Sequence, residues 1–179
     1  MNPEHLLIDG YNLLGKVKGV LGRSDQSLEQ EREAMIIRLG LYARRIGCAV
    51  TIVFDAWKQQ AQVRQVMHRT GVTVMYSETG EKADQVIQQL ARSGGKGLAV
   101  VSSDHEVLAV ARAHGAFTMR SEEFAQRLRD PSRSGRAPSV RGSAQDKDEA
   151  EPVRSKEKKG NPRRLPKKVR QRNRIMRRF

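Results

Sequence analysis

His5-Leu6-Leu7-Ile8-Asp9-Gly10-Tyr11-Asn12 is a short apolar run that ends in an acid, a glycine, an aromatic residue and an amide. The run has no polar face, which is typical of a strand buried on both sides within a parallel sheet. We therefore expect a strand over residues 5–9. A charge directly after such a strand is costly unless it is coordinated or hydrogen-bonded. Asp9 is thus expected to serve a ligand or a polar network.

Apolar strands and amphipathic helices alternate through the first 130 residues. The pattern predicts further strands over 48–54, 72–76, 98–102 and 116–119, and helices over 27–46, 81–91, 104–114 and from Ser121 onward. Residues 10–22 are expected to form a mobile loop with one helical turn, and residues 56–71 are ambiguous. This alternation is typical of an α/β fold with three α/β/α layers around a mainly parallel sheet of about five strands.

Three further acids lie near strand or helix ends. Asp55 and Asp104 each follow an apolar strand, and Asp84 lies just inside a predicted helix. Ligands of open α/β sheets bind at the carboxyl ends of strands, so Asp9, Asp55 and Asp104 are expected on one edge. Carboxylates gathered there repel one another, and Mg²⁺ or Mn²⁺ prefers such hard oxygen ligands. Each acid also has a simpler role available: helix N-cap for Asp104, solvated helix residue for Asp84, turn residue for Asp55.

Smaller polar and aromatic residues beside these acids are further candidates. Asn12 could orient Asp9 or a water molecule, or cap the turn that follows. Ser102 and Ser103 could hydrogen-bond a phosphate, although hydroxyls at such turns are usually local caps. Tyr11 and Trp57 are candidates for stacking on nucleic-acid bases, with plain packing the alternative for Trp57.

The basic residues are unevenly distributed along the chain. Residues 1–130 carry 17 Lys or Arg and 15 Asp or Glu, a net charge of +2, whereas residues 131–179 carry 17 and 5, a net charge of +12. We therefore expect a near-neutral folded domain over 1–130 and a polar linker with a basic, disordered tail over 131–179. Residues 163–179 could form a basic helix from about Pro166. Such a tail favours an anionic polymer as partner, with nucleic acid first.

Several classes of protein are disfavoured by what the sequence contains. A single cysteine, Cys48, excludes an internal disulfide framework and a multi-cysteine zinc site. No signal peptide and no apolar run of about 18 residues is present, so a cytoplasmic protein is expected. Nucleotide-cofactor motifs are missing. A phosphatase of the haloacid type would need a second acid at Tyr11.

The opening motif Leu7-Ile8-Asp9-Gly10-Tyr11-Asn12 resembles that of NYN domains, a branch of the PIN-like nuclease superfamily. The order of later motifs is similar to the YacP-like (Rae1-type) subfamily: Val53-Phe54-Asp55-Ala56, Tyr76-Ser77, Thr79-Gly80-Glu81-Lys82-Ala83-Asp84, Val101-Ser102-Ser103-Asp104-His105-Glu106 and Arg120-Ser121-Glu122-Glu123-Phe124. The resemblance covers residues 4–129. It implies a PIN-like α/β/α fold and a metal-dependent RNA endonuclease that cleaves mRNA on the ribosome. It also implies an acidic metal centre at Asp9, Asp84 and Asp104, with Asp55 as a further acid and Asn12 in the opening motif.

The residues and the resemblance together predict a cytoplasmic RNA endonuclease that uses Mg²⁺ or Mn²⁺. Asp9, Asn12, Asp84 and Asp104 are the expected catalytic residues, and Asp9, Asp55, Asp84 and Asp104 the expected metal ligands. Expected RNA-binding residues are Arg64, Arg69, Lys82, Lys167, Lys168, Arg170 and Arg172, with a solvated surface as the alternative for the first three. A second hypothesis stays open, in which the protein is a non-catalytic RNA- or ribosome-binding adaptor.

Overall fold

The computed structural model describes residues 3–21, 27–56, 63–129 and 167–176. The chain divides into two units, Met1–Arg133 and Ser134–Phe179. The first unit contains one six-stranded sheet in the order β3-β4-β2-β1-β5-β6. Its strands are β1 (His5–Asp9), β2 (Ala49–Phe54), β3 (Gln65–Arg69), β4 (Val72–Tyr76), β5 (Leu98–Val101) and β6 (Phe117–Met119).

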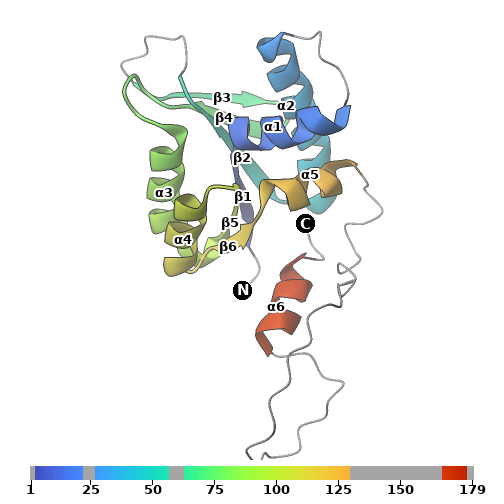
Figure 1. The fold of residues 1–179 in the computed structure, drawn as a ribbon, viewed down its shortest axis with the longest axis vertical. Coiled ribbons are helices and arrows are strands. Elements are labelled where there is room, and N and C mark those ends of the chain that lie inside the picture. Colours follow the sequence, from blue (N-terminus) through green and yellow to red (C-terminus); the bar gives the residue numbers. More distant parts are fainter. Residues whose placement is uncertain (1–2, 22–26, 57–62, 130–166, 177–179) are drawn as a thin grey trace, which may run out of the picture. The chain divides into compact units, whose positions relative to one another are not determined.

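Helices cover both faces of this sheet and complete the three predicted layers (Figure 1). One layer consists of α1 (Gly10–Leu21), α2 (Leu28–Ile46) and α5 (Ser121–Arg129), which contact one another. The other layer consists of α3 (Ala83–Gly94) and α4 (His105–Ala113), and the 3-10 turn η1 (Gly95–Gly97) joins α3 to β5. The predicted α/β fold is therefore confirmed, with six strands where about five were expected.

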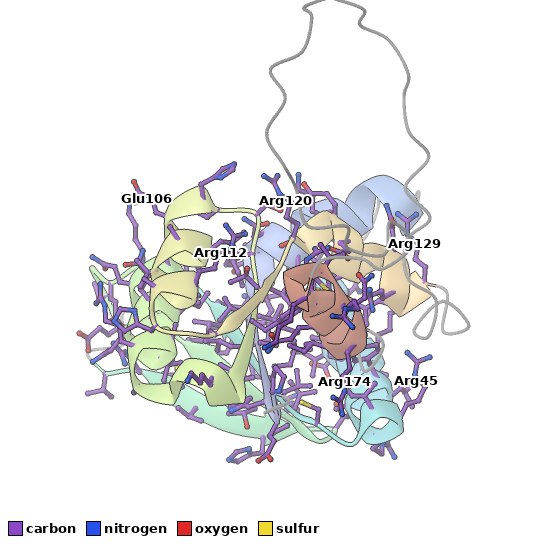
Figure 2. The ribbon with its side chains drawn as sticks, turned by 90° about the horizontal axis from the view of Figure 1, so that it is seen from below. Arg45, Glu106, Arg112, Arg120, Arg129 and Arg174 are labelled. Carbon is purple, nitrogen blue, oxygen red and sulfur yellow. The ribbon has the colours of Figure 1, made fainter. Side chains whose placement is uncertain are left out.

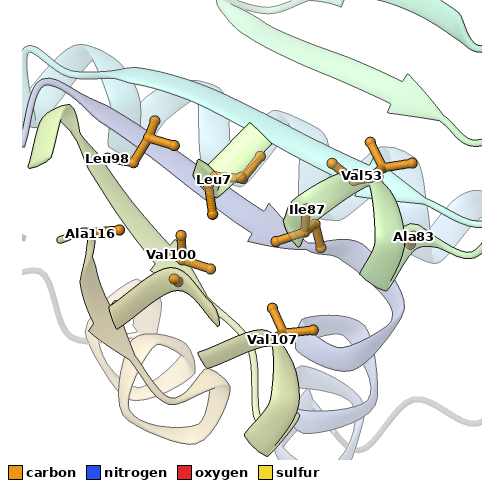
Figure 3. Packing of buried hydrophobic residues seen from close by; sticks show 11 residues of the cluster. Leu7, Val53, Ala83, Ile87, Leu98, Val100, Val107 and Ala116 are labelled. Atoms are coloured by element: carbon orange, nitrogen blue, oxygen red, sulfur yellow. The ribbon is translucent and has the colours of Figure 1, made fainter. Parts of the chain in front are cut away.

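Alternate residues of the central strands point into the two layers, which explains why these strands are apolar throughout. Leu7, Val53 and Val100 belong to the core between the sheet and α3 and α4, shown in Figure 3. Their strand neighbours Leu6, Ile8 and Ile52 are fully buried as well. Burial on both faces fixes the register of β1, and hence the position of the acid at its end.

The predicted ends of α2 are confirmed by its caps. Gln30 donates its backbone N–H to Ser27 Oγ at 3.3 Å, and Ser27 donates its own to Gln30 Oε1 at 3.1 Å, which is a capping box. At the other end Gly47 takes the left-handed conformation, with φ of 60°.

The mobile loop expected over residues 10–22 is wrong, because Gly10–Leu21 forms the helix α1. Leu13, Leu14 and Val17 are buried, and these contacts outweigh the low helix propensity of the glycines. A Cβ built on the exposed Gly15 would meet no atom within 4 Å beyond the adjacent residues and the backbone of its own helix, so this position neither requires nor resists a side chain.

The strand β3 lies in the stretch that the sequence left ambiguous. It pairs antiparallel with β4 through a two-residue turn, in which Thr70 and Gly71 have φ of 51° and 83°. Positive φ at both turn residues matches the right-handed twist of a hairpin. Most of β3 is exposed on both faces, so no apolar alternation marks it in the sequence. It is an edge strand, and it does not alter the parallel core of the sheet.

In the second unit, Lys167–Met176 forms the helix α6. A basic helix from about Pro166 was one expectation for this stretch. The disorder expected over residues 131–160 concerns residues that the structure does not describe. Within the described ranges, no helix combines the length and apolar character needed to cross a membrane.

Candidate functional site

The candidate site lies where the direction of the sheet reverses. From β1 the chain proceeds outward to β2 and β4, then crosses back to β5 on the other side of β1 and continues to β6. Ligands of open α/β sheets bind in the crevice outside the carboxyl ends of strands at such a reversal. Asp9 ends β1 at this point, and Ser102 directly follows β5 beside it.

Asp9 is buried, and each of its two carboxylate oxygens accepts a hydrogen bond from a protein group. Only 6% of the residue is exposed to solvent. Oδ1 accepts the backbone N–H of Asn12 at 3.1 Å, and Oδ2 accepts the hydroxyl of Ser102 at 2.9 Å. Burial, together with the charges of Asp84 and Asp55, raises the pKa of Asp9 to about 6, even though these two hydrogen bonds lower it. Asp9 is thus a carboxyl group that ionises near neutral pH.

Ser102 joins two of the acids across the reversal of the sheet. Its hydroxyl is completely buried, donates to Asp9 and accepts the backbone N–H of Asp104 at 3.0 Å. The local capping role expected of Ser102 explains only the hydrogen bond that it accepts from the backbone of Asp104. The bond to Asp9 connects residues 93 apart in sequence, so only the parallel pairing of β1 and β5 could have indicated it.

Asn12 extends the network toward α5. Besides its backbone bond to Asp9, its side-chain oxygen accepts the backbone N–H of Ser103 at 3.2 Å. Ser103 in turn donates its hydroxyl to Glu122 at 2.8 Å, and Lys16 pairs with Glu122 at 2.7 Å. Lys16, the backbone N–H of Glu122 and Ser103 together lower the pKa of Glu122 to about 2. Asn12 therefore fixes the loop after β5 against β1. The part that Glu122 plays in this network was not predicted from the sequence.

The other three acids hold different positions around this edge. Asp55 Oδ1 accepts the backbone N–H of Ala83 at 2.6 Å, so it caps α3 from the end of β2. Asp104 is the N-cap of α4, with Oδ1 accepting the N–H groups of Glu106 and Val107 at 2.7 and 3.0 Å. The simpler role expected of Asp104 is therefore present. Within the part of the chain that the structure describes, each of these two carboxylates makes its bonds through one oxygen.

Asp84 couples the acids electrostatically. It is partly buried in the first turn of α3, and burial raises its pKa. The negative charges of Asp104 and Asp55 add to this increase, and Asp84 likewise raises the pKa of Asp9. Each of the four predicted acids therefore acts on at least one of the others, as expected for carboxylates gathered at one sheet edge.

The chemistry of this donor set fits a hard divalent cation. Its members are carboxylates, and their mutual repulsion would be relieved by a positive charge. Within the ranges that the structure describes, no three His, Cys, Asp or Glu side chains are already arranged to hold one ion. Asp55 and Asp104 instead serve as helix caps, each through one oxygen.

In the first unit, the two arginines predicted to bind RNA contact acids other than the four predicted metal ligands. Arg64 hydrogen-bonds the carboxylate of Glu81 and Gln89, and Arg69 pairs with Glu33 at 3.5 Å. Lys82 precedes α3, and its charge partly offsets the rise in the pKa of Asp84. Lys167, Arg170 and Arg172 are exposed on α6, while the side chain of Lys168 and all of Trp57 lie outside what is described.

Two arginines labelled in Figure 2 belong to the side formed by α4 and β6. Arg112 donates to Thr118 at 2.7 Å, and Arg120 lies 3.3 Å from the ring of His105. His105 directly follows the acid Asp104 in sequence. Its ring nevertheless has a basic side chain, that of Arg120, as its neighbour at the surface.

Replacing Ser102 with alanine is expected to raise the pKa of Asp9 above its value of about 6, because the lost hydrogen bond is one that favours the ionised form. The carboxyl ¹³C shift of Asp9, followed against pH by NMR, measures this change. Ser93→Ala is the matched control, since that hydroxyl bonds only the backbone of its own helix. An unchanged or lower pKa in Ser102→Ala would contradict the assignment of this hydroxyl.

Comparison with known proteins agrees with this architecture. The sequence matches the family of YacP-like NYN domains over residues 6–178, which extends beyond residue 129, where the motif resemblance ends. It is 33% identical over 89 residues to the Bacillus subtilis protein YacP, and this stretch spans about half of each chain, 49% of this one and 51% of YacP.

Two crystal structures from Bacillus subtilis are similar as well. One, of a mutant of Rae1 (YacP), has a TM-score of 0.57 and 25% identity, covering 70% of this chain and 75% of that one. The other, of Rae1 (YacP), has a TM-score of 0.56 and 25% identity, covering 72% and 74%. The family match spans nearly the whole sequence, and the similar structures share its fold. The chain therefore belongs to the family of YacP-like NYN domains.

Proposed function

We propose that this protein is a divalent-metal-dependent RNA endonuclease that cleaves mRNA in association with the ribosome. The observation that carries the proposal is the buried carboxyl of Asp9 at the reversal of the sheet, electrostatically coupled to Asp84 and Asp55. Membership of the NYN family, whose fold is of the PIN-like nuclease type, supports the same activity.

Asp9, Asp84 and Asp104 would hold Mg²⁺ or Mn²⁺, with Asp55 beside them. When bound, such an ion lowers the pKa of water and stabilises charge on a phosphoryl group. The residues of the chain provide orientation: Ser102 and the backbone of Asn12 hold the two oxygens of Asp9 in place. The Asn12 side chain holds the neighbouring loop, and Asp55 and Asp104 fix the starts of α3 and α4 around the same edge.

The raised pKa of Asp9 gives the proposed reaction a pH dependence. A carboxylate ligand must be ionised to bind a cation, and Asp9 is protonated in the metal-free protein below about pH 6. Activity is therefore expected to increase as the pH rises through this region, and a high metal concentration moves the increase to lower pH.

The basic residues of α6 fit the delivery of this chemistry to RNA. Lys167, Arg170 and Arg172 are exposed on the helix, and the family match includes this stretch. Contacts between such residues and phosphates give affinity that depends on salt but not on sequence. Binding to RNA or to ribosomal RNA through α6, with Lys168 among the contacts, completes the proposal.

Cleavage of a circular single-stranded RNA tests the activity, because only an endonuclease opens a circle. The wild-type protein with Mn²⁺ or Mg²⁺ is expected to linearise it, and a chelator to prevent this. Asp84→Asn is expected to reduce the rate about 100-fold or more, since loss of a ligand removes several kcal/mol of charge stabilisation and each 1.36 kcal/mol is about tenfold. Glu4→Gln is the matched control: this acid is exposed and lies before β1, at the opposite end of the strand from Asp9.

Equal rates for Asp84→Asn and Glu4→Gln would contradict the proposed site. A wild-type protein that binds RNA but leaves both the free circle and ribosome-bound mRNA intact with every divalent metal would contradict the nuclease and favour the adaptor. Repeating the assay with translating ribosomes and a bound mRNA tests the ribosome separately. Cleavage of free RNA and ribosome-bound mRNA at equal rates would contradict the ribosomal part alone.

A further inference from the structure

Arg32 lies among three aromatic rings next to the acidic edge. Its Nη1 donates to the hydroxyl of Tyr11 at 3.1 Å. Its guanidinium carbon lies 6.0 Å from the ring centre of Phe54 and 5.9 Å from that of Tyr76. We call Arg32, Tyr11, Phe54 and Tyr76 the Arg32 cluster. Such contacts fix the direction of a side chain that would otherwise be flexible.

The three rings of the cluster come from the same sheet edge as the acids. Tyr11 is two residues after Asp9, Phe54 ends β2 directly before Asp55, and Tyr76 ends β4. The Phe54 ring touches the backbone beside Asp9, since a Cβ on Gly10 would lie 2.5 Å from it. The Tyr76 ring stacks on Phe54, with centres 5.7 Å apart, and the Tyr11 ring meets it edge-on at 5.2 Å. The cluster is therefore continuous with the site.

The charge of Arg32 is not matched by an acid within the described residues. Arg64, Arg69 and Arg127 each pair with a carboxylate, whereas the polar contact of Arg32 is with the neutral hydroxyl of Tyr11. A guanidinium has five N–H donors, and this contact uses one of them. Arg32 is also partly exposed, as are Tyr11 and Tyr76, while Phe54 beneath them is fully buried. Packing of α2 on the sheet accounts for the ring contacts, but among the described residues it provides no acceptor for the remaining donors.

We propose that the Arg32 cluster binds a nucleotide of single-stranded RNA beside the cleavage site. Arg32 holds a backbone phosphate through its fork of N–H groups, a geometry that arginine provides and lysine does not. The partly exposed rings of Tyr11 and Tyr76 flank the adjoining nucleotide, and stacking on such rings tolerates any base. This inference rests on the proposed nuclease function, because it identifies how the RNA strand is placed against the acids.

Fluorescence anisotropy with a short labelled single-stranded RNA tests the inference in a chelator, where no cleavage interferes. Arg32→Gln in the full chain is expected to weaken binding about tenfold. It is also expected to reduce the slope of log K against log salt by about 0.7, the value for one phosphate contact on a single strand. Arg38→Gln is the matched control, because Arg38 is exposed on the same helix and the substitution removes the same charge. A purely structural role of Arg32 would leave the salt slope unchanged.

Equal affinities and equal salt slopes for Arg32→Gln and Arg38→Gln would overturn the inference. If Arg32→Gln does not fold, as judged by circular dichroism, Arg32→Lys replaces it: severalfold weaker binding supports the phosphate fork, and wild-type binding overturns it. The result is independent of the cleavage assay. Loss of binding in Arg32→Gln alongside a wild type that cleaves neither circular RNA nor ribosome-bound mRNA would reject the nuclease while keeping the subsite, and the reverse result would reject the subsite alone.

Discussion

Asp9→Asn is expected to abolish RNA cleavage and, in the absence of metal, to make the protein more stable at alkaline pH. The loss of activity is expected to be at least about 100-fold, for the reason given for Asp84. The gain in stability follows from burial. The pKa of Asp9 is raised from 3.8 to about 6, so the folded state binds this proton more tightly than the unfolded state does. Ionised Asp9 therefore destabilises the fold, and asparagine cannot ionise.

The size and the pH range of this effect follow from the two pKa values. The difference between 3.8 and about 6 corresponds to about 3 kcal/mol at most, all of it present above the folded pKa and none of it below the unfolded pKa. Asparagine bonds Asn12 and Ser102 less strongly than a carboxylate does, so a net gain of about 1–2 kcal/mol is expected, or roughly 4 °C in melting temperature.

Melting temperatures in chelator, measured from about pH 5 to about pH 8, test the prediction. The difference between Asp9→Asn and wild type should increase with pH, while that between Glu4→Gln and wild type should stay constant. An Asp9→Asn protein less stable than wild type at the upper end of this range would show that the hydrogen bonds to the carboxylate outweigh its burial.

Metal binding is expected to stabilise the wild type more than Asp9→Asn. A cation that binds the folded state stabilises it by RT ln(1 + [L]/Kd). Mn²⁺ should therefore raise the melting temperature of the wild type and have a smaller effect on Asp9→Asn. This comparison detects the metal without relying on cleavage. Equal increases in both proteins would place the metal elsewhere.

The sequence predicted those parts of the fold that depend on burial of whole strands and on local caps. The apolar stretch before Asp9 required a strand buried on both faces, and Ser27 and Gly47 marked the ends of α2 correctly. It failed where tertiary contacts override local signals. Burial of Leu13, Leu14 and Val17 makes α1 a helix despite its glycines, and β3 is an exposed edge strand without periodicity.

The site was predictable in its residue types but not in its contacts. A charge after a buried strand required partners, and the edge rule indicated which acids lie near it. The partners that orient Asp9 are nevertheless the uncharged side chain of Ser102, directly after β5, and the backbone N–H of Asn12. Neither group is marked by a pattern in the sequence. Likewise, the link from Asn12 through Ser103 to Glu122 depends on α5 packing beside α1.

Gly10→Ala is expected to destabilise the protein by about 1–3 kcal/mol, as other additions to filled cores do, and to reduce cleavage strongly. A Cβ at this position would lie 2.5 Å from two carbon atoms of the Phe54 ring and 2.7 Å from the carbonyl oxygen of Val53. The carbonyl belongs to a central strand and cannot yield. The start of α1 must therefore move away from β2, and Asn12, which holds Asp9 through its backbone N–H, moves with it.

Gly15→Ala in the same helix separates this steric effect from helix propensity. It makes the same chemical change at an exposed position where the new Cβ meets no atom within 4 Å beyond its own helix, so it is expected to be neutral or to stabilise by up to about 1 kcal/mol. Chemical denaturation of both variants measures the two free energies, and the circular RNA assay measures their activity. Wild-type stability and metal response in Gly10→Ala would mean that Phe54 can turn aside without disturbing Asp9. Since Phe54 also carries the stack with Tyr76 and lies under Arg32, such a protein should then lose RNA affinity while retaining its metal response. The pattern of loss thus distinguishes a glycine required by the acidic site from one required by the Arg32 cluster.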